Sequence, residues 1–121
     1  MSFKAALEDL LERIPGALGA IMADWEGEAV DQVVSSRMDA FDMKIIGAHK
    51  GIILTNMRQA MRDLDSDDLQ EIIVTTEKTQ TLIIPITTDY YLVLTLQKDA
   101  SFGRAQFEAR KTVIALRTEI A

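Results

Sequence analysis

The chain has 121 residues, of which 48% are hydrophobic and 26% charged, a composition typical of one folded domain. Nineteen acidic and 13 basic residues give a net charge of −6, which argues against nucleic acid or a membrane surface as a partner. The chain lacks cysteine, so disulfides and thiolate chemistry are excluded. We expect a cytoplasmic protein, because neither a secretory signal nor an apolar run near the ~18 residues of a membrane span occurs.

The first quarter of the chain predicts a helix followed by a hairpin. Ser2 can cap the helix, and Pro15-Gly16 ends it. Its apolar side chains recur every three or four residues. They are Phe3, Leu7, Leu10, Leu11 and Ile14. A strand is predicted over 18–24 and another over 29–34, joined by a turn over 24–27 in which Gly27 supplies the unusual backbone angle.

The stretch 39–64 reads as one long helix with more apolar surface than one core can cover. At about 100° per residue its apolar positions sweep roughly 240°, whereas a helix on a single core needs a stripe of little more than about 100°. These positions are Phe41, Ile45, Ile46, Ala48, Ile52, Ile53, Leu54, Met57, Ala60, Met61 and Leu64. A helix covered on two sides in so small a protein predicts a second subunit.

The remaining narrow arc of this helix forms a strip of small and basic residues. It consists of Lys44, Gly47, Gly51, Thr55, Arg58 and Arg62. Two glycines within a helix cost about 1 kcal/mol each relative to alanine, so a close approach of a partner helix or a sheet strand is expected there. Alternatively, the strip docks an acidic patch of a partner through its arginines. A third reading is an arginine finger supplied in trans.

The second half of the chain predicts three strands and a last helix. An acidic loop over 66–68 precedes strands over 70–75, 80–86 and 90–96. Ser101 can cap the last helix, whose core stripe is Phe102, Ala105, Ala109, Val113, Leu116 and Ile120. Phe107 and Ile114 lie off this stripe. We expect them to pack against the first helix, and if exposed they mark a second binding surface.

The order of elements is helix, two strands, helix, three strands, helix. Short connections make each group of strands antiparallel, and one five-stranded sheet with helices on both faces is the simplest packing. The expected fold is therefore an α/β sandwich in one domain over 1–121.

Residues able to support catalysis are sparse. The lone histidine, His49, is expected in the core or an interface, and the sequence has neither a phosphate loop nor a dinucleotide fingerprint. The acidic residues Asp63, Asp65, Asp67, Asp68 and Glu71 lack the spacing of a calcium loop and are expected to form a solvated turn. No cofactor, metal or enzymatic activity is predicted. Trp25 at the hairpin tip either packs within the subunit or contacts a partner.

Several short motifs together resemble the roadblock / dynein light chain family, and in particular its bacterial branch of MglB-type gliding-motility regulators. They are Ile14-Pro15-Gly16, Leu18-Gly19-Ala20, Asp24-x-Glu26-Gly27, Glu71-Ile72-Ile73-Val74-Thr75, Leu82-x-Ile84-Pro85-Ile86, Tyr91-Leu92-Val93-Leu94 and Gly103-Arg104. Each motif alone is a hydrophobic run with turn residues, but their order and spacing extend over nearly the whole chain.

The resemblance implies a profilin-like fold that dimerises with itself or with a related roadblock chain. Middle helices of two subunits pack together, and their third strands meet and join the two sheets. The expected interface residues are Ile45, Ile46, Ile53, Met57, Ala60, Met61 and Ile73. Family members bind or regulate small Ras-like GTPases or serve as scaffolds. Candidate partner-binding residues are Lys44, Gly47, Gly51, Arg58, Arg62 and Trp25.

Three functions follow as hypotheses. The first is a non-catalytic regulator or adaptor of a small GTPase, and the second is a structural dimerisation scaffold. The third is a small-molecule sensor. The strand faces are mostly aliphatic, which argues against this function because ligand pockets need convergent polar groups.

Overall fold

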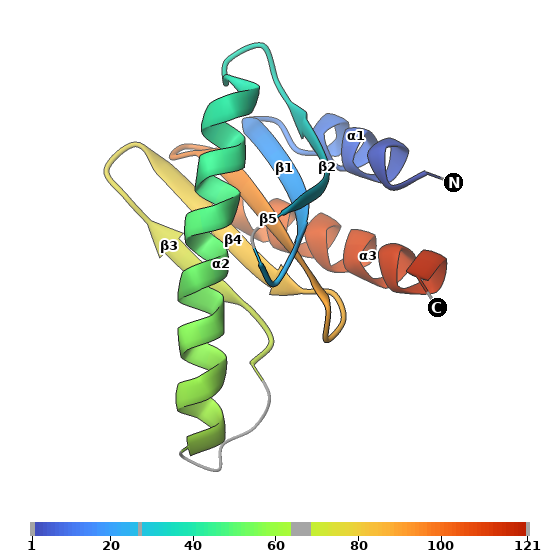
Figure 1. The fold of residues 1–121 in the computed structure, drawn as a ribbon. Helices are drawn as coiled ribbons and strands as arrows, with labels where there is room; N and C mark the ends of the chain where they lie inside the picture. Colours follow the sequence, from blue (N-terminus) through green and yellow to red (C-terminus); the bar gives the residue numbers. More distant parts are fainter. Residues whose placement is uncertain (1, 27, 64–68, 121) are drawn as a thin grey trace.

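A computed structural model describes residues 2–26, 28–63 and 69–120 (Figure 1). The N-terminal half contains α1 (Phe3–Arg13), β1 (Ala17–Asp24), β2 (Ala29–Val34) and α2 (Ala40–Asp63). The C-terminal half contains β3 (Ile72–Thr75), β4 (Thr79–Pro85), β5 (Tyr90–Gln97) and α3 (Phe102–Ile120). The predicted order of elements is confirmed. The predictions for Gly27, Leu64, Asp65, Asp67, Asp68 and the loop over 66–68 lie outside the described residues.

The helix ends follow the predicted local signals. The Ser2 hydroxyl accepts a hydrogen bond from the Ala5 N–H at 3.1 Å, and the Ser101 hydroxyl accepts one from the Arg104 N–H at 3.3 Å. α1 ends before Pro15, and Gly16 adopts a φ of +90° that favours glycine. These signals explain why the helix starts were predictable from the sequence.

The five strands form one antiparallel sheet in the order β2-β1-β5-β4-β3. The β1–β2 hairpin joins the β3–β4–β5 meander where β1 pairs with β5. β3 lies at one edge and β2 at the other, so β3 has one side open for another strand. β3 begins at Ile72, slightly later than the predicted start at residue 70.

Helices cover both faces of the sheet, as Figure 1 shows, with α2 on one face and α1 and α3 on the other. Alternating side chains of the strands therefore enter two separate cores. Leu82, Leu92 and Leu94 pack with α1 and α3. Ile21, Ile83 and Val93 pack on the α2 side. The predicted α/β sandwich is confirmed. Among the described residues, none of the helices has the length and hydropathy to cross a membrane.

Candidate interaction surfaces

Two glycines seat α2 on the sheet. Gly47 and Gly51 are buried, and a Cβ at Gly47 would lie 2.9 Å from Cγ2 of Ile21. A Cβ at Gly51 would overlap the Tyr91 hydroxyl and lie 2.8 Å from its Cζ. The same hydroxyl donates a hydrogen bond to the Gly47 carbonyl at 3.0 Å. The glycines therefore let the helix backbone approach β1 and β5 closely, which is one of the two close approaches predicted.

This seating corrects the prediction that Gly47 and Gly51 are available to a partner. The strip of small and basic residues faces inward at its glycines, because the missing side chains admit Ile21 and Tyr91. Lys44 and Arg62, on the same strip, remain exposed, and Arg58 is half-buried. Thr55 donates its hydroxyl to the Gly51 carbonyl at 2.9 Å, which satisfies it within the helix.

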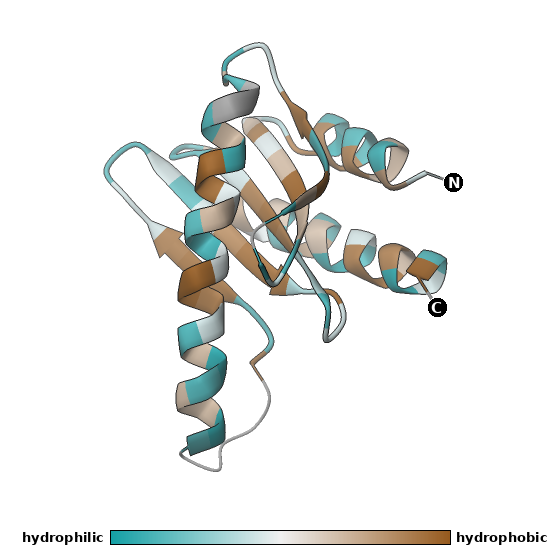
Figure 2. Ribbon diagram, in the orientation of Figure 1, coloured by the Kyte–Doolittle hydropathy of each residue, from teal (hydrophilic) through white to brown (hydrophobic). Residues whose placement is uncertain are grey.

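Because α2 rests on its glycine side, much of its apolar arc faces solvent. Figure 2 shows hydrophobic residues along the side of α2 that is turned away from the sheet. Ile45 is 42% exposed, Ile53 37% and Met57 41%. Ile52, which was not among the predicted interface residues, is 61% exposed. A single subunit thus leaves an apolar face of α2 uncovered, as is typical of interaction sites.

The other predicted interface residues occupy different positions. Ile46 is half-buried and packs against the core under α2, Ala60 is exposed, and Met61 is half-buried. Ile73, on the edge strand β3, is 46% exposed and pairs with Leu82, so its side chain lies on the α3 side of the sheet. Ile73 therefore adjoins the open sheet edge rather than the face of α2.

Trp25, Arg58 and Arg62 come together at one end of α2. The Trp25 ring centroid lies 5.3 Å from that of Tyr91, and the Arg58 guanidinium lies 4.3 Å above the indole. With Thr88 and Asp89, these three residues line a hollow of about 480 Å³. Trp25 packs within the subunit, as the first of its two alternatives predicted. Its buried Nε1 has no hydrogen-bond partner among the described residues.

The Tyr91 hydroxyl lies at the centre of this arrangement. Burial raises the pKa of Tyr91 to about 12, and the negative charge of Asp24 acts in the same direction. The role of Tyr91 in supporting α2 was not predicted from the sequence. The available signal was a glycine pair one turn apart in a helix, for which a bulky strand residue is the natural counterpart.

The other candidate residues that the structure describes lie apart from one another. His49 is exposed on α2, so its predicted place in the core is wrong, whereas an interface position stays a prediction. Glu71 pairs with Arg110 at 3.0 Å instead of belonging to an acidic turn. Within the part of the chain that the structure describes, no group of three potential metal ligands comes together.

The prediction that Phe107 and Ile114 pack against α1 is wrong. Phe107 is 59% exposed and Ile114 62%. α3 buries Ala105, Ala109 and Leu116 against the sheet, and at about 100° per residue the two larger side chains point almost directly away from it. Their exposure creates the second surface that the sequence offered as the alternative.

Comparison with known proteins agrees with this fold. Residues 4–96 match the model of the Roadblock/LC7 domain. The crystal structure of MglC from Myxococcus xanthus is similar at 29% identity and a TM-score of 0.71, covering 98% of this chain and 99% of that chain. No curated protein matches the sequence.

Two further solved structures have lower identity but a closer backbone. A Roadblock/LC7 domain from Streptomyces avermitilis is 15% identical with a TM-score of 0.87, covering 97% of this chain and 96% of that chain. The gliding protein MglB from Thermus thermophilus is 17% identical with a TM-score of 0.86, covering 98% of this chain and 90% of that chain. The chain belongs to the Roadblock/LC7 family and is similar to its bacterial MglB and MglC members.

Proposed function

We propose that this roadblock protein dimerises through the outward face of α2 and the open edge of β3. The dimer then binds a small Ras-like GTPase and modulates its activity or location without chemistry of its own. The exposed apolar side chains of α2 carry the first part of this proposal. Burying a fully exposed side chain of this size contributes ~1.5–3 kcal/mol, and these are about half exposed, so covering each contributes about half of that. Covering three or four of them still favours association.

The open edge of β3 supports the same arrangement. β3 pairs with β4 on one side only among the described strands, and unpaired strand edges recruit other strands. A two-fold axis would set β3 against β3 of a second subunit and place the two α2 helices beside each other on one joined sheet. The partner subunit is the same chain or a related roadblock chain.

The GTPase part of the proposal rests on the family resemblance and on the surface around Trp25. Arg58 and Arg62 place positive charge there on a chain whose net charge is −6. The Trp25 indole lies under the Arg58 guanidinium and adds apolar surface beside these charges. Such a surface suits carboxylates on a partner and holds switch loops by shifting populations between existing conformations.

The test is a binding measurement with a Ras-like GTPase from the same genome, loaded with GTP or GDP and followed by light scattering after size exclusion. The proposal predicts a gain in mass that depends on the bound nucleotide. Arg62→Glu should weaken this binding, whereas Arg37→Glu, an exposed arginine before α2, should leave it unchanged.

If the dimer gains no mass with any GTPase of that genome, the GTPase-regulator function is rejected in favour of a structural dimerisation scaffold. Loss of GTPase binding in both arginine variants would mean that general charge, rather than the Trp25 surface, is responsible. The dimer itself is tested separately by the mass of the protein alone.

A further inference from the structure

α3 exposes an apolar ridge on the face of the molecule opposite α2. Phe107 and Ile114, two turns apart, are each about three-fifths exposed. A groove of about 240 Å³ lies beside Ile114 and is lined in part by Arg110, Val113 and Arg117. Large apolar side chains that stand together beside a groove are typical of protein interaction sites.

Basic residues flank this ridge on both sides. Four of the five exposed charged side chains of α3 are positive, Glu119 near its C-terminal end being the exception, although the whole chain is acidic. At about 100° per residue, Arg110 and Arg117 lie on one side of the ridge, and Arg104 and Lys111 on the other. The Lys111 ammonium lies 5.2 Å from the Phe107 ring centroid, so charge and apolar surface are continuous.

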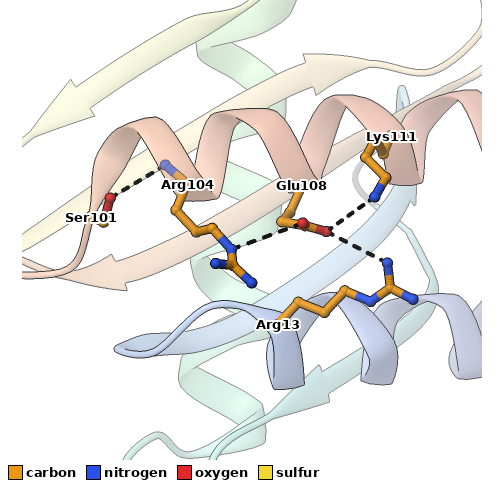
Figure 3. A network of polar contacts seen from close by, with 5 residues as sticks. All are labelled: Arg13, Ser101, Arg104, Glu108 and Lys111. Carbon is orange, nitrogen blue, oxygen red and sulfur yellow. Dashed lines mark hydrogen bonds and ion pairs between the residues drawn. The ribbon is translucent and has the colours of Figure 1, made fainter.

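Figure 3 shows that two of these cations, Arg104 and Lys111, lie beside Glu108. The Glu108 carboxylate, almost fully buried, lies 3.7 Å from Arg13, 3.9 Å from Arg104 and 3.9 Å from Lys111. One carboxylate cannot neutralise three cations, and the cluster stays positive even with Asp9, which lines the same groove between α1 and α3.

The other two cations are also positioned. Arg110 pairs with Glu71, and Arg117 donates a hydrogen bond to the Ile86 carbonyl. Side chains fixed before binding lose less entropy on association. These contacts restrict the cations but leave Arg104, Arg110 and Lys111 more than half exposed and available to a partner.

From this combination we propose that the outer face of α3 docks an acidic amphipathic helix of another protein. Apolar side chains of that helix would cover Phe107 and Ile114, and its carboxylates would face Arg104, Lys111, Arg110 and Arg117. Charge complementarity and the apolar ridge thus specify one kind of partner. This site is independent of the proposed dimer and of GTPase binding.

Two other occupants fit the surface less well. A second copy of the chain packed symmetrically here would set like charges against each other. An anionic membrane would repel the remaining acidic surface, and two apolar side chains insert less hydrocarbon than the single acyl chain that already gives only marginal binding. An acidic helix avoids both penalties.

The location gives the surface a distinct role. α3 lies beyond residues 4–96, which match the family model, and on the opposite face of the sheet from α2. A dimer formed through α2 would leave two such faces free. The dimer would then link a protein bound on its α2 side to a second protein bound at α3.

The test uses a synthetic helical peptide of about 18 residues with leucines about seven apart between rows of glutamate, and a matched peptide with lysine for glutamate. Each is titrated into the isotope-labelled full chain and followed by nuclear magnetic resonance. We expect the acidic peptide to shift resonances of α3, to bind roughly tenfold or more tightly than the basic peptide, and to weaken as salt rises.

Matched variants distinguish this site from general stickiness. The double variant Phe107→Ala with Ile114→Ala should weaken the acidic peptide roughly tenfold, whereas Val30→Ala, an exposed apolar residue of β2, should not. Replacing Arg104 and Lys111 by glutamine should reduce the salt dependence. All four α3 positions are exposed, so the variants should fold.

Three outcomes would overturn the proposal. They are failure of the acidic peptide to bind, resonance shifts on α2 instead of α3, and equal binding by the Phe107/Ile114 double variant. If the acidic peptide fails to bind but phosphatidylserine vesicles do bind, the first of these outcomes assigns the face to a membrane.

Discussion

At the scale of single residues, substitution of Gly51 tests whether its close contact with Tyr91 holds α2 on the sheet. Alanine normally stabilises a helix interior by about 1 kcal/mol relative to glycine. At Gly51 the added Cβ would meet the Tyr91 ring and hydroxyl, so the helix or the ring must move. We expect Gly51→Ala to lower the free energy of unfolding by ~1–3 kcal/mol, measured by chemical denaturation.

Gly103→Ala is the matched control. Gly103 lies in the first turn of α3, and a Cβ there meets no heavy atom within 4 Å among the described residues. The control should be neutral or slightly stabilising. Equal destabilisation by both substitutions would show that the close approach at Gly51 is not what holds α2.

Because the Tyr91 hydroxyl is buried, we expect the free energy of unfolding to fall at high pH. Its pKa is about 12 in the folded chain and 10.0 when exposed, so the fold favours the neutral phenol. The resulting stabilisation is complete below about pH 10 and is lost as the pH rises from 10 to about 12. Tyr91→Phe also removes the hydrogen bond to Gly47, at a cost of about 1 kcal/mol near neutral pH.

The measurement is the free energy of unfolding of both proteins between about pH 8 and 12. The advantage of the natural chain over Tyr91→Phe should narrow above about pH 10. If the difference in free energy of unfolding between the two proteins stays constant across this range, burial does not raise the pKa of Tyr91.

At the scale of elements, the outward face of α2 is the feature on which dimerisation depends. Ile53→Asp places a charge among Ile45, Ile52 and Met57, and a charge buried in an interface without a partner is costly. We expect the variant to be monomeric. Since Ile53 is partly exposed in one subunit, its monomer should lose no more than about 1 kcal/mol of stability.

Phe107→Asp is the corresponding change on α3 and should leave the dimer intact. Light scattering measures the mass, and far-ultraviolet circular dichroism reports the fold. A folded, dimeric Ile53→Asp protein would remove α2 from the interface.

Hydropathy patterns predicted the elements better than their orientation. The period of apolar residues and the turn residues placed every helix and strand, because each signal is local. The inward side of α2 was not predictable from hydropathy, since the residues that touch the sheet include Gly47 and Gly51, which have no apolar side chain. These glycines leave room for strand side chains to approach the helix backbone. One of those side chains, Tyr91, is 44 residues from Gly47 in the sequence, so a local pattern does not reveal the contact.

For α3 too, the sequence pattern predicted the helix but not which of its apolar faces is covered. The stripe of Ala105, Ala109 and Leu116 was predictable, and it is buried. Two larger apolar residues on the opposite side suggested a neighbouring helix, but α1 lies beside α3 on the same face of the sheet and contacts its flank through the Arg13–Glu108 pair. Which of two apolar faces is covered depends on tertiary packing, which periodicity alone cannot specify.

At the scale of the whole molecule, the sandwich separates two surfaces of different character. The α2 face with the β3 edge is apolar and suits a permanent subunit contact. The α3 face combines a short apolar ridge with positive charge and suits a partner that is steered by charge. The sheet between them holds both surfaces in fixed positions, as the adaptor role proposed above requires.

The mass of the natural protein in solution, measured by light scattering over a wide range of concentration, tests the central claim most directly. A dimer is predicted, with twice the 13.5 kDa of one chain, falling to a single chain in Ile53→Asp. A mass of one chain at every concentration would contradict the account, because the exposed face of α2 would then lack the subunit proposed to cover it.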